Sequence, residues 1–208
     1  MLVPKRRLSA AVHVGEAVPC DSASQALHGG AILIAVGIER SNRPVAASRL
    51  ASITRQLLDA SPLCAIATVN PGGSAHINTA YFAWSPEFDV VWLSEPRAKH
   101  SKNIRAHNSA AIAVFDSRQT WGRPDRGIQL FGHARETERG GNAEVVYAAR
   151  FPAYEEAGVG AYRFYVLHPR RVKLFDEGAL GTGVFVTAKV NAGGRLVWER
   201  TEVYRPRR

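Results

Sequence analysis

The spacing of apolar and polar positions after residue 47 predicts one short helix near the start of the folded part. Four apolar residues recur at spacings that place them on one helical face: Leu50, Ile53, Leu57 and Leu58. Ser48 is the candidate N-cap. The helix should end before Ser61-Pro62, because a residue that precedes proline avoids helical backbone angles.

The chain from residue 63 to residue 134 reads as strands separated by turns and one helix. Asn70–Gly73 and Ser85–Asp89 have the glycine, proline and polar residues of tight turns. The expected strands span 63–69, 74–82, 90–93, 110–115 and 127–134, and the expected helix spans 98–107. The first three strands form a meander, and a barrel or a sandwich would cover its edges.

The C-terminal third mixes helix and strand. A short helix is expected over 143–151. Strands are expected over 162–167 and 172–175, divided by His168-Pro169, and a hairpin is expected from 184–190 and 196–199. The pattern therefore predicts a mainly β fold of the α+β class.

Residues 1–47 lack a long periodic segment and differ in this from residues 48–208. The basic cluster Lys5-Arg6-Arg7 is not followed by the apolar run of a secretory signal. We interpret 1–47 as a disordered extension, or as the product of a start codon placed too far upstream, and 48–208 as the folded domain. A cytoplasmic location is the expectation.

Composition narrows the class of protein. Of the 208 residues, 46% are hydrophobic and 22% are charged, which is ordinary globular usage. The longest apolar run, Ala31–Ile38, is far shorter than the roughly 20 residues that cross a bilayer, so no membrane partner is expected. Cys20 and Cys64 are too few for a disulfide framework, and the seven histidines lack zinc-motif spacing, so no metal site is expected.

The net charge of +9 suggests either an anionic ligand or a nucleic acid. The basic residues are spread along the chain, and the sequence has no helix-turn-helix or RNA-binding signature. A nucleic-acid partner is therefore the disfavoured alternative.

One segment carries candidate chemistry. Four basic side chains and one histidine fall between Arg97 and Arg105, with no acid among them, where a helix should begin. Lys99, His100 and Lys102 oppose the helix dipole, and a bound anion would satisfy both these side chains and the free N–H groups of the first turn. A phosphate monoester suits this cluster, and a solvated basic face is the alternative.

Five motifs, in this order and spacing, resemble the pyridoxamine 5′-phosphate oxidase-like flavoproteins: Ala65–Gly73, His76–Asn78, Val91–Ser94, Arg97–Ala106 and Ala110–Phe115. The resemblance covers residues 50–137 well. It implies an antiparallel split β-barrel with a few short flanking helices. It also implies a homodimer that binds two FMN molecules in clefts between the subunits.

The resemblance further implies which residues hold the cofactor. The strand that includes His76, Ile77, Asn78 and Thr79 would run beside the flavin, and Trp92, Leu93 and Ser94 would line its ring or ribityl chain. The loop from Arg97 to Lys102, with Ser101 in it, would hold the phosphate. Lys99 and His100 stand where the family often has an Arg-Lys pair. Because His76 replaces a frequent arginine, Lys102 or Arg97 would share the phosphate.

Two candidate cofactor-binding residues lie outside these motifs. Trp121 lies in a polar loop, and an exposed aromatic side chain there needs a partner such as the cleft over the flavin. Gln129, on the fifth expected strand, could hydrogen-bond a ring edge, or could be a polar residue of the barrel surface.

The expected function is an FMN-dependent oxidoreductase that passes hydride between a small organic substrate and the flavin. No catalytic residue is assigned. The C-terminal pattern through which pyridoxamine phosphate oxidases bind their substrate is missing, so the vitamin B6 reaction is not assigned. Three alternatives share the resemblance: a deazaflavin (F420)-dependent reductase, a haem-binding protein, and a non-enzymatic flavin-binding or sensor protein.

Overall fold

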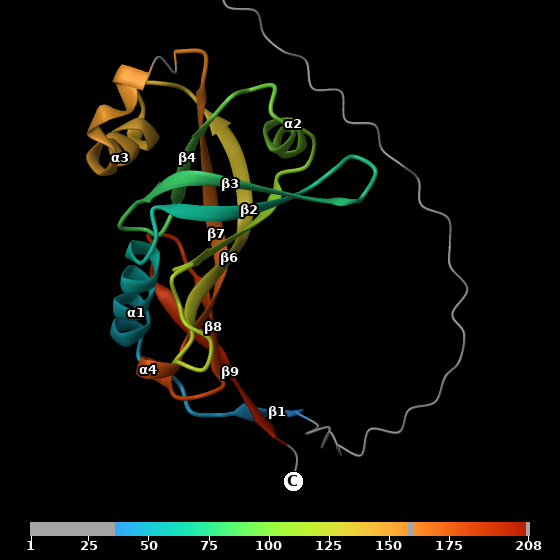
Figure 1. Ribbon diagram of the computed structural model, residues 1–208, viewed down its shortest axis with the longest axis vertical. Coiled ribbons are helices and arrows are strands. Elements are labelled where there is room, and N and C mark those ends of the chain that lie inside the picture. The colour runs from blue at the N-terminus through green and yellow to red at the C-terminus, as the bar shows by residue number, and fades with distance from the viewer. Residues whose placement is uncertain (1–35, 158–159, 207–208) are drawn as a thin grey trace, which may run out of the picture. The chain divides into compact units, whose positions relative to one another are not determined.

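The computed structural model describes residues 36–157 and 160–206, which form an antiparallel sheet with short helices around it (Figure 1). The strands of this part are β1 (Val36–Ser41), β2 (Leu63–Val69), β3 (Ala75–Trp84), β4 (Val90–Ser94), β5 (Ser109–Phe115), β6 (Arg126–Thr137), β7 (Arg163–Asp176), β8 (Val184–Val190) and β9 (Leu196–Pro206). The helices are α1 (Ala47–Asp59), α2 (Lys99–Ala106), α3 (Asn142–Arg150) and α4 (Glu177–Leu180), with a 3₁₀ helix over Pro152–Ala157.

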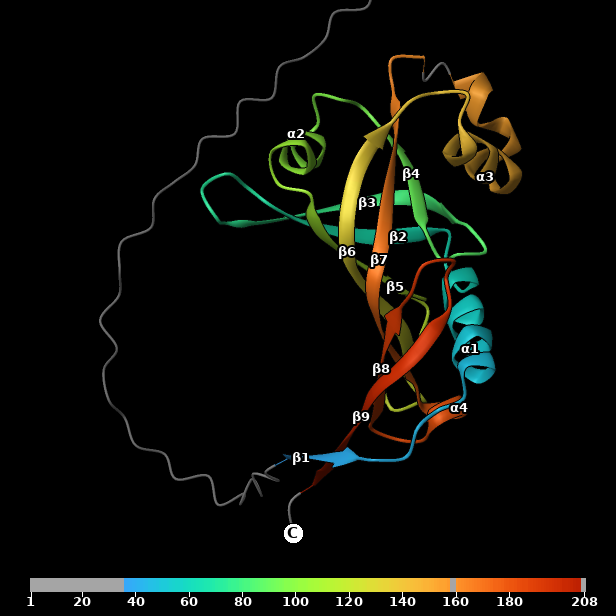
Figure 2. The same cartoon turned by 180° about the vertical axis from the view of Figure 1, so that it is seen from behind.

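The sheet closes into a barrel through pairing of its two ends. Its strand order is β1-β9-β8-β7-β4-β3-β2-β5-β6, and β6 pairs back onto β7. The strands from β7 to β6 therefore form a closed antiparallel barrel, which confirms the expected split-barrel class with a few short helices. Figure 2 shows β8, β9 and β1 continuing the sheet away from β7.

Helix α1 packs its apolar face on the barrel, as the spacing predicts. Leu50, Ile53, Leu57 and Leu58 are all buried. The expected cap was wrong: Ala46 is the N-cap, because its carbonyl accepts the first helical hydrogen bond from Leu50, so the helix begins before Ser48. Of the described helices, none is long and apolar enough to cross a membrane.

Strand β7 runs unbroken through His168-Pro169, where a break was expected. The pairing of β6 with β7 passes from Gly132–Pro169 to Phe131–Arg171, so Arg170 has no partner on β6 and forms a bulge in β7 directly after the proline. Proline has no N–H for the ladder, and a bulge is where a sheet tolerates it. Gly132 makes the bulge possible, since a Cβ there would overlap the His168 carbonyl oxygen.

Regular structure is present before the expected boundary at residue 47. Val36–Ser41 forms β1, which pairs with β9, and β9 itself runs to Pro206 instead of ending at residue 199. Residues 1–35 of the expected extension lie outside the described residues. Periodicity missed β1 because most of its described side chains are exposed and it gains its place through backbone pairing.

Two apolar clusters support the fold. One fills the barrel interior and the space under α1. The other lies between α3 and the outer side of β3, β4 and β7, and includes Ala83, Val91, Tyr147, Tyr154 and Phe164. The second cluster fixes α3 beside the ends of β3 and β4.

Candidate functional site

A cleft of about 780 Å³ opens where β3, the end of β4, the start of α2 and α3 meet. Figure 1 shows α2 and α3 on either side of β3 and β4. One side of the cleft is formed by Asn78–Tyr81, Leu93–Glu95, Ala98 and His100, and the other by Tyr147, Arg150–Tyr154 and Tyr162. This volume is in the range of small-molecule and cofactor sites.

The structure brings five of the fourteen candidate residues into this cleft: Asn78, Thr79, Leu93, Ser94 and His100. They come from three elements, β3, β4 and α2, that sequence analysis placed in one site. The meander explains this convergence, because β3 pairs with β4 and the chain enters α2 directly after β4.

Helix α2 begins at the edge of the cleft without a capping side chain among the described residues. Ala98 is the N-cap, and the first turn contains no acid. Three exposed cations surround this helix start: Arg97, Lys99 and Lys102. Open N–H groups and nearby cations together form a site for an anion.

His100 faces the barrel end and does not share the exposure of its cationic neighbours. Its side chain is only 4% exposed, and its Nε2 shares a hydrogen bond with Ser94 Oγ at 2.8 Å. Burial, and then the nearby His76, lower the His100 pKa below its usual value. The lowered pKa favours the neutral form of His100, which contributes a hydrogen-bonding ring at this end of the barrel.

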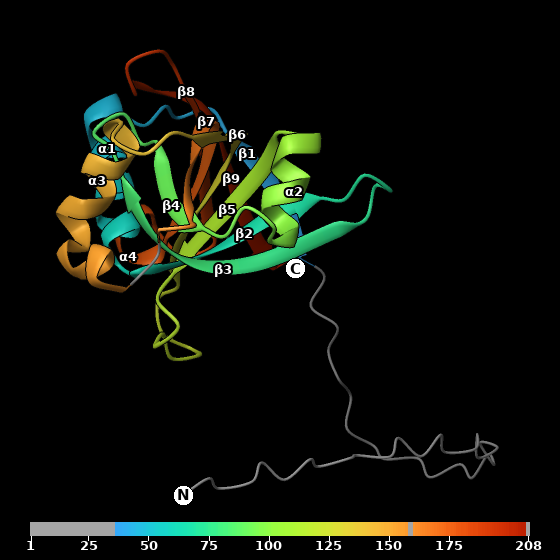
Figure 3. The ribbon, with the colours of Figure 1, turned by 90° about the horizontal axis from the view of Figure 1, so that it is seen from above.

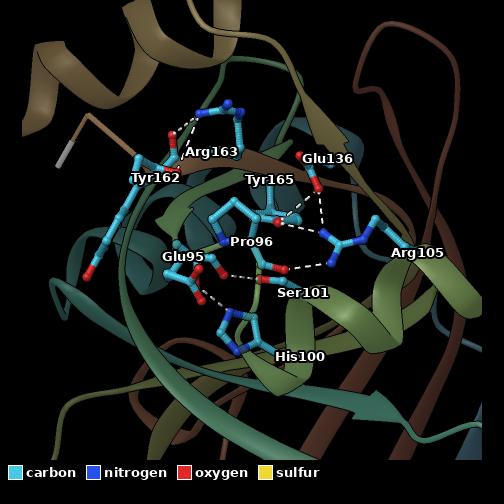
Figure 4. Close-up of polar contacts among 11 residues, drawn as sticks. Glu95, Pro96, His100, Ser101, Arg105, Glu136, Tyr162, Arg163 and Tyr165 are labelled. Atoms are coloured by element: carbon cyan, nitrogen blue, oxygen red, sulfur yellow. Dashed lines mark hydrogen bonds and ion pairs between the residues drawn. The ribbon is translucent and has the colours of Figure 1, made fainter.

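Hydrogen bonds from side chains of α2 hold the loop that leads from β4 into α2 (Figure 4). Ser101 Oγ donates to the Glu95 carbonyl at 2.9 Å, and Arg105 Nη2 donates to the Pro96 carbonyl at 2.6 Å. Both donors lie on α2, so the helix holds the loop that precedes its own N-terminus. Ser101 is thus buried, holds the loop through the Glu95 carbonyl, and does not line the cleft.

Further hydrogen bonds connect α2 to strands β6 and β7 of the barrel. Arg105 Nη1 donates to Glu136 Oε2 on β6 at 2.7 Å, and Tyr165 on β7 donates its hydroxyl to the same oxygen at 3.0 Å (Figure 4). The Tyr165 ring stacks on Trp92 and meets the edge of His100. Sequence reasoning missed Glu136 and Tyr165, which lie 31 and 60 residues from Arg105 and form no local motif.

Asn103 fixes the opposite side of α2. Its buried amide donates to Thr68 Oγ1 and to Asn70 Oδ1, both at 3.0 Å. These bonds tie the helix to β2 and to the turn that follows it. The start of α2 is therefore positioned by contacts on two sides.

The structure corrects the expectation for Trp92. Its side chain is fully buried in the barrel interior and does not line the cleft. Side chains alternate along a strand, and β4 turns Val90 and Trp92 inward. The neighbouring Leu93 lines the cleft instead.

The remaining candidates lie outside the cleft of their own chain. His76 and Ile77 precede the part of β3 that lines it, and Ile77 is exposed on the outer barrel face. Gln129 is exposed on β6, between Ala113 of β5 and Lys173 of β7. Trp121 lies in the loop between β5 and β6 and is the most exposed of the large apolar side chains described.

Sequence analysis also missed the aromatic side of the cleft. The expected helix over 143–151 carries Tyr147 and Arg150 into the cleft, and Phe151 follows. Tyr147 packs on Phe151 and Phe164. Arg150 stacks on the Phe82 ring and donates to the Ser61 carbonyl at 3.0 Å, and burial lowers its pKa. Helical periodicity predicted Val145, Val146 and Ala149 on the apolar side of this helix, and this was wrong: Val145 and Ala149 are exposed, and the buried residues of α3 are Ala143 and Tyr147.

The side chains of the described region offer few metal ligands in one place. No group of three or more His, Cys, Asp or Glu residues in that region could hold a metal ion. The polar features of the cleft are instead the open helix start, the Ser94–His100 pair and the β3 polar residues Asn78 and Thr79.

Comparison with known protein families gives one match. The family model for pyridoxamine 5′-phosphate oxidase matches residues 53–176, which is more than half of the chain and includes β2 to β7 with the cleft. No curated protein sequence matches the chain significantly.

Solved structures share the fold at low sequence identity. A heme binding protein from Mycobacterium smegmatis is 19% identical, with a TM-score of 0.54, over 72% of this chain and 60% of that one. A conserved hypothetical protein from Mycobacterium tuberculosis is 16% identical, with a TM-score of 0.53, over 69% and 92%. A Clostridium acetobutylicum protein related to general stress protein 26, of the pyridoxine phosphate oxidase family, is 11% identical, with a TM-score of 0.54, over 68% and 95%.

Proposed function

Since the chain belongs to the pyridoxamine 5′-phosphate oxidase family, we propose that it binds FMN in the cleft between β3, β4, α2 and α3 and passes hydride between the flavin and a small organic substrate. One observation carries the proposal. The cleft joins an aromatic side to an open, cation-flanked helix start, which matches a flat ring system attached to a phosphate.

The residues at the helix start fit a phosphate monoester. The first-turn N–H groups of α2 lack a capping side chain in the described region, and Lys99, Lys102 and Arg97 surround them. A phosphate monoester has nearly two negative charges and several acceptor oxygens, so it would bind both the N–H groups and the cations. The neutral His100 would leave Ser94 positioned by their shared hydrogen bond.

FMN, when bound, supplies the two-electron redox chemistry. The protein's part is to bind and orient it. Asn78 and Thr79 present polar groups along one side of the cleft, while Leu93 offers an apolar contact. Tyr147 and Phe151 form the opposite aromatic side, which would exclude water from the reacting ring.

A second copy of the chain belongs to the same proposal. The outer face of β3, β2, β5 and β6 carries uncharged, mostly apolar positions, among them one cross-strand row of Ile77, Ala67, Ala111 and Phe131. Ile77 and Phe131 are exposed. The barrel interior is already filled by other side chains, so these outer side chains cannot be buried within their own chain. A symmetric partner would cover them and so stabilise a dimer.

The test is FMN binding by Lys99→Ala/Lys102→Ala, followed by isothermal titration. Loss of two charge-assisted contacts should weaken FMN binding by about tenfold or more per residue. Riboflavin, which has no phosphate, should bind the variant and the wild type equally. Lys189→Ala/Arg195→Ala removes two exposed cations from the β8–β9 hairpin and serves as the matched control.

Unchanged FMN affinity in the double lysine variant would refute the phosphate site. If the wild-type protein does not bind FMN but binds a deazaflavin or haem, FMN is refuted as the cofactor, and the cleft remains the proposed binding site. Wild-type protein that binds FMN but never reduces it with any donor would support the flavin-binding or sensor alternative over the oxidoreductase.

A further inference from the structure

A second hollow, of about 480 Å³, lies where β7 pairs with β8, beside the turn into β9. Figure 3 shows this turn, in red, projecting at the top of the view. The residues that line the hollow are Arg170, Arg171, Lys189, Val190 and Asn191, and none of them lines the cofactor cleft. The lining residues include three cations and no acid, so the wall of the hollow is positively charged.

The bulge in β7 brings two neighbouring arginines to this hollow. Side chains of a regular strand alternate between its two faces, so consecutive residues normally point to opposite sides. Arg170 has no partner on β6 or β8, whereas Arg171 pairs with Phe131 on β6 and with Lys189 on β8. A bulge redirects the side chain of its extra residue, and here Arg170 and Arg171 line the same hollow.

Packing between β6 and β7 holds the bulge in place. A Cβ at Gly132 would overlap the His168 carbonyl oxygen and would crowd Pro169, so only glycine permits this close approach. Pro169 is itself buried, directly before Arg170. The backbone that carries the two arginines is therefore fixed before a ligand binds, and such preorganisation favours affinity.

The cations of the hollow share one carboxylate. Arg171 and Lys189 stand directly opposite each other in the sheet, where like charges destabilise a pair. Glu199 offsets part of this repulsion, because its carboxylate lies 3.0 Å from Arg171 Nε and 3.8 Å from Lys189 Nζ. Arg170 is exposed and forms no ion pair within the described part of the chain. Three positive charges and one negative charge leave an excess of two positive charges.

Both arginines keep hydrogen-bond donors for a ligand. Arg171 donates to Glu199 through Nε, and its two terminal nitrogens have no partner among the described residues. The guanidinium of Arg170 also has no partner in that region. Each guanidinium can therefore donate two parallel hydrogen bonds to one phosphoryl group. Lys189 adds a point charge, and Asn191 adds an exposed amide.

We propose that this hollow binds a diphosphate group, with Arg170 and Arg171 each holding one phosphoryl group and Lys189 balancing their charge. Two adjacent guanidinium groups match two linked phosphoryl groups, and the excess positive charge matches their negative charge. The hollow has the volume of a small-molecule site, whereas a nucleic acid needs cations along the length of its backbone. The proposal does not rest on the proposed function, because the two sites share no lining residue.

Isothermal titration of the wild-type protein at low salt tests the ligand class. Pyrophosphate should bind at least about tenfold more tightly than orthophosphate, because only pyrophosphate engages both arginines at once. ADP that binds as tightly as pyrophosphate would identify a nucleotide as the source of the diphosphate, and weaker ADP binding would identify the free ion; both results support the site. Equal affinity for orthophosphate and pyrophosphate, or no binding of pyrophosphate, overturns the proposal.

Substitution of Arg170 tests the residue that the bulge redirects. Arg170→Ala should weaken pyrophosphate binding by at least about tenfold, and should leave the melting temperature without ligand unchanged because Arg170 has no partner in the described part of the chain. Arg170→Lys keeps the charge without the planar group and should recover only part of the affinity. Arg123→Ala, which removes an exposed arginine from the β5–β6 loop, is the matched control and should bind as wild type. If Arg123→Ala weakens binding as much as Arg170→Ala, binding follows net charge and the proposal fails.

The start of α2 is the competing site for pyrophosphate. Lys99→Ala/Lys102→Ala should bind pyrophosphate as the wild type does, and a loss of binding in this variant would place the ligand at α2 and overturn the proposal. Arg170→Ala should in turn leave FMN affinity unchanged, so the two sites fail or stand separately. A thymidine oligonucleotide that binds more tightly than pyrophosphate would assign the surface to a nucleic acid and would also overturn the proposal.

Discussion

Replacing Arg105 with alanine should damage the cofactor site from outside the cleft. Arg105 does not line the cleft, but it holds the Pro96 carbonyl at 2.6 Å and the Glu136 carboxylate at 2.7 Å. In the variant, the loop between β4 and α2 loses its hydrogen bond at the Pro96 carbonyl, and α2 loses its ion pair with Glu136 on β6. The N–H groups and cations proposed to bind the phosphate then lose their fixed arrangement.

The size of the effect follows from the exposure of the two bonds. The side chains of Arg105 and Glu136 are 44% and 29% exposed, so solvent screens the ion pair and it contributes about 0.2–1 kcal/mol. The bond from the charged guanidinium to Pro96 adds about 1 kcal/mol. We expect Arg105→Ala to lower the free energy of unfolding by about 1–2 kcal/mol and to weaken FMN binding by about three- to tenfold.

Urea unfolding and FMN titration measure the two effects, and Arg171→Ala is the control. Arg171 pairs with Glu199 at 3.0 Å with similar exposure, but it lies on β7 away from the cleft. Arg171→Ala should lower stability by about 0–1 kcal/mol and leave FMN affinity unchanged. The reasoning fails if Arg105→Ala loses stability yet binds FMN as tightly as Arg171→Ala.

Two further outcomes are expected. Gly132→Ala should lower the free energy of unfolding by about 1–3 kcal/mol in calorimetry or urea unfolding, because its Cβ would overlap the His168 carbonyl oxygen. Gly72→Ala is the control and should be nearly neutral, because a Cβ there meets nothing within 4 Å. Equal stability of the two variants would contradict the close approach of β7 to Gly132. Burial lowers the His100 pKa, so the unfolded chain binds its proton more readily: stability should be unaffected above about pH 6.5 and fall as pH drops below it, and His100→Gln should show a shallower decline in melting temperature from pH 7.5 to 5.5. Identical slopes for the variant and the wild type would rule out His100 as the source.

The sequence predicted what depends on neighbours along the chain. The α1 face, the β2–β3 hairpin and the start of α2 are each set by local spacing, and all three occur where expected. The continuity of β7 through Pro169 was not predictable in this way, because it depends on Gly132 in another strand.

The residues of the candidate site also differ in how far the sequence could predict them. Ser94 and His100 are six residues apart, and both line the cleft: the basic cluster at the helix start pointed to His100, and the family resemblance to Ser94. The burial of Trp92 depends on which face of β4 turns toward the barrel interior, and this needs the register of the whole sheet. Glu136 and Tyr165 reach Arg105 only after the barrel has closed, so no local pattern contains them.

The position of β7 in the chain has a consequence for synthesis. This strand pairs with β4, β6 and β8, yet it begins only at Arg163. A nascent chain that ends before Arg163 has the facing edges of β4 and β6 without their partner, and such edges are prone to pair with other chains. Pairing between segments so distant in sequence is also slow. The barrel closes, and the support for α3 and the start of α2 forms, only once β7 has left the ribosome, so the cleft is completed late in translation.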